Sequence, residues 1–176
     1  TTIGTPRDGN VLGKLKANPE SIRLGGGESQ INRVKRVVAQ ADVSGISSSG
    51  MVEARLYLFD SNDKEIEQEL FENNLGSEGL KVEVEVLKKK DVPLELETDG
   101  IKPAAGHALG DISYEPRTIA VAGGEEDIKS LTKITIPSEA FELDGISSTQ
   151  EVSIDVSEYL PENISLVDAT AGTVIV

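Results

Sequence analysis

The sequence contains no cysteine and no tryptophan, and it has only three phenylalanines and three tyrosines. The lack of cysteine excludes disulfide bonds, thiolate zinc sites and a cysteine nucleophile, but it leaves the redox compartment open. Because aromatic residues make up only 3% of the chain, a large aromatic-lined ligand pocket is not expected. There is also only one histidine, so any serine-histidine-aspartate arrangement must use His107.

Long hydrophobic runs are also missing. No apolar run approaches the ~18 to 20 residues that a helix needs to cross a bilayer. The segment that starts at Thr1 has neither the basic nor the apolar part of a secretion signal. We therefore expect that this stretch of chain is not itself inserted into a membrane.

Basic residues are scarce in the second half of the chain. Residues 91–176 hold 4 basic and 17 acidic residues, whereas residues 1–90 hold 13 and 14. Nucleic acids and anionic lipids are bound mainly through lysine and arginine contacts to phosphate. The charge distribution therefore predicts no nucleic-acid partner, and only the first half could tolerate an anionic one.

The sequence repeats itself at a spacing of 97 residues. Of the 29 positions from 6 to 34, 10 are identical after this shift, and most of them are glycine, proline or aliphatic residues. Such residues fix turns and cores, so the repeat specifies a fold. The identical pairs are Pro6/Pro103, Gly9/Gly106, Leu12/Leu109, Gly13/Gly110, Pro19/Pro116, Ile22/Ile119, Gly26/Gly123, Gly27/Gly124, Glu28/Glu125 and Ile31/Ile128.

We predict two domains, residues 1–88 and residues 91–176, each near the lower size limit for one core. The charged stretch 88–91 has no apolar periodicity and is the predicted joint. The second copy opens with the strand-like stretch VPLELETDG, whereas the first has only TTIGT before its proline. We therefore expect that the first copy lacks most of its first strand and that the chain is a fragment of a longer protein.

Most local patterns predict β-strands. Residues 51–59 alternate between aliphatic side chains on one face and Glu53, Arg55, Tyr57 and Phe59 on the other, and residues 80–87 and 151–156 alternate in the same way. Helical spacing is brief and supports a turn or two in each copy. The spaced aliphatic residues are Ile31, Val34 and Val37 in the first copy, and Ile128, Leu131 and Ile134 in the second. The predicted fold class is all-β, with two tandem small sandwich-like or curled-sheet repeats that each contain one short helical turn.

The glycines at 25–27 and 123–124 precede these helical turns. A phosphate-binding loop would need a lysine and a serine or threonine after the glycines, but here Glu28 and Glu125 follow. Acidic residues in a first turn are favoured by the helix dipole. The glycines therefore predict structural turns and no anion site.

We predict no catalytic, cofactor-binding or metal-binding residue. Asp111 and Ser113 lie near His107 in sequence, but the first copy has an asparagine and two lysines at the equivalent positions. The stretch from Asp60 to Phe71 lacks the glycine and the glutamate of a calcium loop and predicts a charged hairpin or loop tip. We therefore expect a protein that is not an enzyme.

An exposed surface is the remaining candidate for function. Arg55, Tyr57 and Phe59 share one face of the predicted strand 51–59, and Phe71 follows soon after. Aromatic residues with arginine are typical of binding anchors. The alternative is that a second sheet or the neighbouring copy covers this face.

The order of these motifs resembles the YbbR-like repeat of bacteria. The order is proline, Gly-x-x-Leu-Gly, Pro-x-x-Ile, Gly-Gly, an acidic turn, then DGISS and alternating strands. Residues 92–131 match this order best. The resemblance covers both copies and implies an all-β repeat, similar in fold to the C-terminal domain of a ribosomal protein that binds 5S RNA. It transfers no catalytic or ligand-binding residues.

The resemblance also implies a membrane context. Family members commonly carry an N-terminal membrane anchor with several repeats outside the membrane, and they include the regulator of the membrane-bound diadenylate cyclase. We therefore expect a non-enzymatic interaction module on the extracytoplasmic face of a bacterial membrane, with a membrane protein such as a diadenylate cyclase as its partner. The alternative is a bacterial surface adhesion or carbohydrate-binding module of immunoglobulin-like type.

Overall fold

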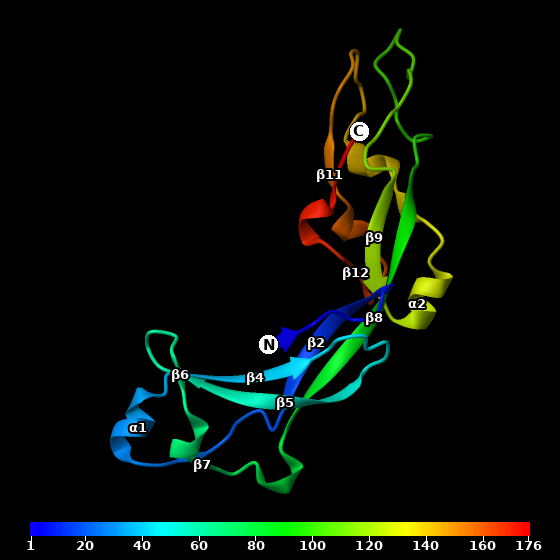
Figure 1. The fold of residues 1–176 in the computed structure, drawn as a ribbon. Coiled ribbons are helices and arrows are strands. Elements are labelled where there is room, and N and C mark those ends of the chain that lie inside the picture. The colour runs from blue at the N-terminus through cyan, green and yellow to red at the C-terminus, as the bar shows by residue number, and fades with distance from the viewer. The chain divides into compact units, whose positions relative to one another are not determined.

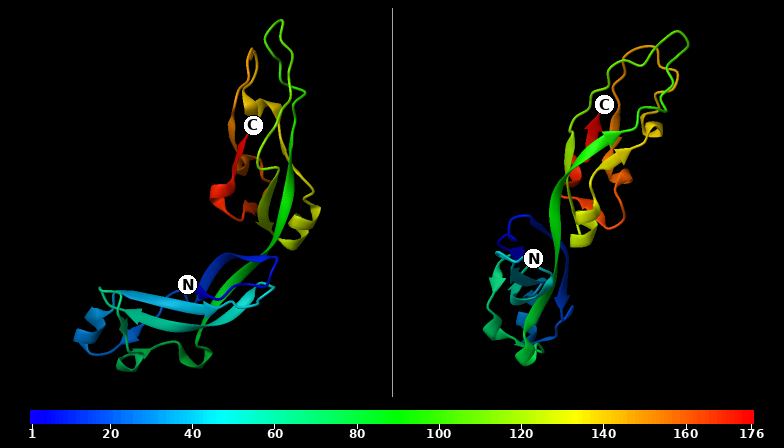
Figure 2. Two further views of the ribbon diagram at one scale, coloured as in Figure 1. Left: turned by 45° about the horizontal axis from the view of Figure 1, so that its top comes forward. Right: turned by 90° about the vertical axis from the view of Figure 1, so that its right-hand side faces the viewer.

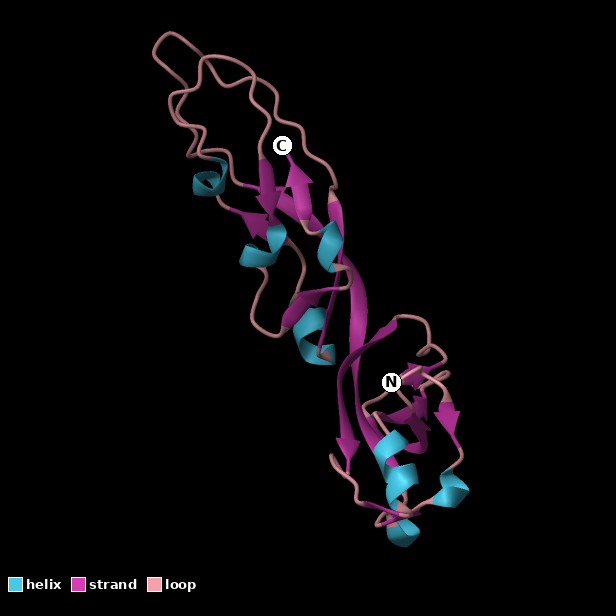
Figure 3. Ribbon diagram, turned by 90° about the vertical axis from the view of Figure 1, so that its left-hand side faces the viewer, coloured by secondary structure: helices cyan, strands magenta, loops and turns pink.

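The computed structural model describes residues 1–176 and divides into two compact units, Thr1–Leu87 (unit 1) and Lys88–Val176 (unit 2). Strands predominate in both (Figures 1 and 3), and α-helix is limited to α1 (Glu28–Arg33) and α2 (Glu125–Ser130). The prediction of an all-β fold is confirmed. The structure also contains no helix with the length and apolar character to span a bilayer.

Unit 1 is built around β5. The strands of unit 1 are β1 (Thr2–Ile3), β2 (Asn10–Asn18), β3 (Leu24–Gly25), β4 (Arg36–Asp42), β5 (Gly50–Phe59), β6 (Glu65–Ile66), β7 (Glu72–Asn73) and the first part of β8 (Leu80–Leu96). Strand β4 pairs antiparallel with β5, and Figure 2 shows the two lying side by side. Strands β6 and β8 also pair antiparallel with β5, whereas the short β1 pairs parallel with β4. Strand β2 pairs with β8, and β3 pairs with β7 in a separate two-stranded sheet.

The alternation predicted for β5 is present in the structure. Leu56 and Leu58 are buried, whereas Tyr57 between them is half-buried and Arg55 before them is exposed. This pattern places the aliphatic side chains of β5 on the core of unit 1 and leaves its other face to solvent. Two 3₁₀ turns, η1 (Gln68–Leu70) and η2 (Gly76–Glu78), connect the shorter strands.

Unit 2 uses the second part of β8. Its other strands are β9 (Thr118–Gly123), β10 (Ile134–Ile136), β11 (Ser153–Asp155), β12 (Ile164–Leu166) and β13 (Thr173–Ile175), and its 3₁₀ turns are η3 (Ser138–Phe141), η4 (Val156–Tyr159) and η5 (Ala169–Ala171). Strand β9 pairs antiparallel with both β8 and β12, β10 pairs parallel with β8, and β11 pairs with β13. One core cluster, which includes Phe141, fills the unit.

Turns at equivalent positions of the two units match. Gly45 and Gly145 both have positive φ, which favours glycine. The backbone N–H of Gly45 donates to the backbone carbonyl of Thr5 at 2.8 Å, and the backbone N–H of Gly145 donates to the backbone carbonyl of Lys102 at 2.7 Å. These matched turns support the interpretation of a duplicated unit.

Each unit contains one short helix, as the sequence predicted. Helices α1 and α2 contain six residues each, and both C-cap residues, Val34 and Leu131, have extended backbone. Val37 lies in β4 and Ile134 lies in β10. The three-residue spacing therefore continues past each helix, because the short helix runs directly into a strand.

One strand prediction needs correction. The segment 151–156 forms a strand only over Ser153–Asp155, because the Asp155 side chain accepts a hydrogen bond from the Ser157 N–H and starts the turn η4. The charged stretch 88–91, predicted as the joint, begins where unit 2 begins, and it lies within β8 and pairs with β9. Charged residues are tolerated in this strand because their backbone is paired and their side chains can reach solvent or other partners.

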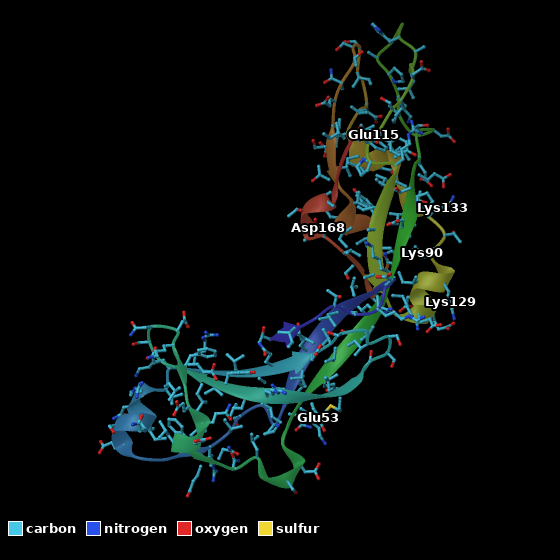
Figure 4. The ribbon with its side chains drawn as sticks, viewed as in Figure 1. Glu53, Lys90, Glu115, Lys129, Lys133 and Asp168 are labelled. Atoms are coloured by element: carbon cyan, nitrogen blue, oxygen red, sulfur yellow. The ribbon has the colours of Figure 1, made fainter.

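Lys90 has such a partner (Figure 4). Its ammonium Nζ donates to the carbonyl oxygens of Ile128 and Leu131 at 3.2 and 2.6 Å. These carbonyls lie at the C-terminal end of α2, where helical carbonyl groups lack partners within the helix. Lys90 therefore anchors the end of α2 to the strand β8.

We expect the change Lys90→Met to lower the free energy of unfolding of unit 2 by about 1 kcal/mol, because two carbonyls lose a charged donor while the apolar stem of the side chain is kept. Urea denaturation followed by circular dichroism would measure this loss. Lys89→Met is the matched control, since Lys89 is exposed. An equal effect of both changes would contradict the capping role.

Candidate functional site

The exposed side of β4 and β5 in unit 1 forms the candidate binding surface, which we call the outer face. Strand β5 contributes Arg55, Tyr57 and Phe59, and their cross-strand partners on β4 are Gln40, Val38 and Arg36 respectively. Tyr57 and Phe59 are half-buried, whereas Arg55 is exposed. The structure therefore brings together the three residues that the sequence predicted for one face.

Arginine and aromatic groups are in contact on this face. The Arg36 guanidinium carbon lies 4.4 Å from the centroid of the Phe59 ring, which is within the range of a cation–π interaction. The same guanidinium donates to the Asp63 carboxylate at 2.8 Å. Arg36 therefore holds the Phe59 ring and one end of the face in a defined position.

Asp63 belongs to the charged hairpin tip that the sequence predicted between β5 and β6. Within this turn, backbone N–H groups of Asn62 and Lys64 donate to the Asp60 carboxylate at 2.8 and 3.1 Å. These backbone hydrogen bonds hold the pKa of Asp60 below its ordinary value. The Asp60 carboxylate therefore stabilises the turn through these backbone hydrogen bonds.

A shallow hollow of about 290 Å³ lies at the other end of the face. The residues that line it are Ile3, Gln40, Asp42, Glu53, Arg55 and Tyr57. The Ser44 hydroxyl and the Ser44 backbone N–H donate to Asp42 at 2.6 and 2.9 Å and lower the pKa of this carboxyl. The hollow thus combines an apolar residue and an aromatic ring with one cation and two carboxylates, a mixture suited to a polypeptide surface.

Phe71, the aromatic residue that follows the strand in sequence, does not belong to the outer face. Its side chain is half-buried and packs against the core cluster that contains Leu56 and Leu58. The reason is topological: η1 follows β6 and returns the chain across the core side of β5. The local sequence around Phe71 does not predict this path of the chain.

Sequence reasoning missed a pocket in unit 2. The pocket has a volume of about 390 Å³ and an apolar part that includes Ile101, Ile112 and Phe141. His107, Asp111 and Ser113 also line it. The pocket forms between two loops, residues 98–113 and 141–150, so no periodic pattern could have revealed it.

The three polar residues share this pocket, but no hydrogen bond joins their side chains. His107 takes part in the fold through its backbone N–H, which donates to Ala104 at 3.0 Å. A serine nucleophile requires a histidine within hydrogen-bonding distance to accept its proton. The arrangement therefore offers polar contacts to a ligand and no assembled catalytic group.

The glycine-rich turns have a structural role. Gly27 and Gly124 are the N-cap residues of α1 and α2, and Glu28 and Glu125 lie in the first turns, as predicted. A Cβ on Gly26 would lie 3.1 Å from the carbonyl oxygen of Leu70, so this glycine allows close approach of two backbones. The structure contains no group of three or more histidine, aspartate or glutamate side chains that could hold a metal ion.

Comparison with known proteins connects these features to a family. The sequence pattern of the family described as YbbR-like protein matches residues 1–86. This segment is the first copy, which was expected to lack most of its first strand. No curated protein matches. The crystal structure of a YbbR-like protein from Streptococcus pneumoniae is similar at 10% identity and a TM-score of 0.39, over 98% of this chain and 88% of that one.

Proposed function

We propose that this chain is a non-catalytic, regulatory interaction module that binds a membrane protein on the extracytoplasmic side of a bacterial membrane. The match of residues 1–86 to the family described as YbbR-like protein supports this proposal. A membrane diadenylate cyclase is the partner that the family resemblance favours. The outer face of unit 1 is the proposed contact surface.

The composition of the outer face is the observation that supports this proposal. Half-buried aromatic rings beside arginines, surrounded by polar and charged side chains, are typical of protein interfaces. Arg55 is exposed, and Tyr57 and Phe59 still have accessible surface. These side chains can therefore be buried further by a partner without any change in the sheet.

Charge supports a protein partner over nucleic acid. The chain carries a net charge of −14, and the outer face mixes both signs. A mixed face fits a partner with a complementary arrangement of charges and does not fit a uniformly anionic polymer.

The test is a reconstitution with a purified membrane diadenylate cyclase in lipid nanodiscs. We expect the chain to bind the cyclase and to change its rate of cyclic di-AMP synthesis. The double change Tyr57→Ala, Phe59→Ala should weaken this binding at least about tenfold, because interface aromatics commonly contribute more than 1 kcal/mol each. Surface plasmon resonance and product formation would measure the two effects.

Ile175→Ala in β13 is the matched control, since Ile175 is an exposed apolar residue outside the outer face. Circular dichroism would confirm that both proteins remain folded. Binding by the control but not by the double variant supports the proposal. Equal binding by both variants would show that the outer face is not the contact surface. Binding to a glycan array with no effect on the cyclase would favour the carbohydrate-binding alternative.

A further inference from the structure

Met51 holds the only sulfur atom of the chain, because the sequence contains one methionine and no cysteine. It is the second residue of β5, and its exposed fraction is 49%. The next residue, Val52, packs against a core cluster of unit 1. Because side chains alternate along a strand, Met51 lies on the opposite side of the sheet, which is the outer face, together with Glu53 and Arg55.

The neighbours of Met51 on the outer face are polar. Its cross-strand partner on β8 is Glu83, and the partner of Glu53, which Figure 4 labels, is Lys81. Both glutamates are exposed. Among the large apolar side chains that are exposed in this structure, Met51 is the one that lies on β5. At this end of β5 the apolar surface of the outer face therefore comes from a single thioether side chain.

The fold does not require an apolar side chain at this position. Gly45 and Gly145 form matched turns of the two units, and the residues that follow them at the same spacing are Met51 and Glu151. Glu151 is exposed. A polar group at position 51 is therefore compatible with the fold, so oxidation of the sulfur should change the surface of the sheet and leave its core intact.

Hydrogen peroxide oxidises a thioether in a two-electron step. A lone pair of the sulfur attacks one oxygen of the peroxide, an S–O bond forms as the O–O bond breaks, and the second oxygen leaves as water after proton transfer. The sulfur loses two electrons and the peroxide gains them. The product, methionine sulfoxide, is polar, and methionine sulfoxide reductases return it to the thioether.

We propose that Met51 is a site of reversible oxidation by peroxide, and that its sulfoxide weakens the binding of a partner protein to the outer face. The second part rests on the proposed function of this face. A methionine side chain adapts its shape to a partner and gains free energy when it leaves water, whereas a buried sulfoxide oxygen loses its hydrogen bonds to water. Oxidation of one exposed atom therefore regulates the contact without a change of fold.

The first test needs no partner. The intact chain is treated with hydrogen peroxide, the excess is removed with catalase, and tryptic peptides are analysed by mass spectrometry. The peptide that contains Met51 should gain one oxygen atom at a rate close to that of N-acetylmethionine amide, because Met51 is exposed. Methionine sulfoxide reductases A and B together should remove this oxygen from the folded protein. Circular dichroism should show the same melting temperature for the oxidised and the untreated chain.

The second test measures binding to the membrane diadenylate cyclase in nanodiscs by surface plasmon resonance. The oxidised chain should bind roughly fivefold more weakly than the untreated chain, since about half of the apolar burial of a methionine is lost, and reductase treatment should restore binding. Met51→Gln has a polar side chain of similar length and should bind roughly fivefold more weakly with or without peroxide. Met51→Leu has no sulfur, so peroxide should not change its binding.

Oxidation of Met51 that is much slower than oxidation of the free residue would overturn the proposal, and so would unfolding of the oxidised chain. Equal binding by the oxidised and the untreated chain would also contradict it, as would an effect of peroxide on Met51→Leu. If the untreated chain does not bind the cyclase, the proposed function fails separately. The rate and the reversal of oxidation then still decide whether Met51 is an oxidation site.

Discussion

Replacing Phe141 with alanine is expected to lower the free energy of unfolding of unit 2 by about 3 to 5 kcal/mol and to leave unit 1 unchanged. Phe141 is a fully buried aromatic residue, with an exposed fraction of 2%. Its loss removes a large apolar side chain and leaves a cavity that the surroundings fill only in part. The effect should stay local, because the core cluster of unit 2 contains no residue of unit 1.

Hydrogen exchange measured by mass spectrometry distinguishes the two units. Faster exchange is expected in residues 92–176 only. Leu58→Ala is the matched change in unit 1, where Leu58 has an exposed fraction of 1% and belongs to a separate cluster, and it should accelerate exchange in residues 1–86 only. If either change destabilises both units to the same extent, the chain has one cooperative core and the division into two units fails.

Gly123→Val should destabilise unit 2 by about 2 kcal/mol, because overpacking of a filled interior typically costs 1 to 3 kcal/mol. A Cβ on Gly123 would lie 2.5 Å from Cδ1 of Ile164 and 3.1 Å from the carbonyl oxygen of Asn163. Ile164 is buried, and Gly123 pairs with it across β9 and β12. The added methyl groups therefore push β12 away from β9.

Gly110→Val is the control, since a Cβ at Gly110 would meet no atom within 4 Å. Thermal denaturation should show a clearly lower melting temperature for Gly123→Val and little change for Gly110→Val. Gly26→Val in unit 1 should resemble Gly123→Val, because Gly26 is its counterpart and lies against Leu70 and Phe71. A fully stable Gly123→Val protein would show that close approach is not the reason for glycine at this position.

The amino-acid sequence determined the strand content and the turns. Strand β5 could be predicted because side-chain alternation is a local pattern with a period of two residues. The acidic residues after Gly27 and Gly124 excluded a phosphate-binding loop in advance, because they place negative charge at the helix start. The grouping of Arg55, Tyr57 and Phe59 on one face followed from the same alternation.

Only the tertiary structure decided which segments meet. Ile134 is buried because Leu94 lies beside it in the same core cluster. Phe71 reaches the core, Lys90 caps α2, and His107 lines a pocket with Asp111 and Ser113. These contacts join residues that are far apart in the chain or that lie in loops without periodicity. A local sequence pattern therefore cannot predict them. The sequence therefore specified the strands and the composition of the outer face, while the fold decided which segments pack together and which side chains face solvent.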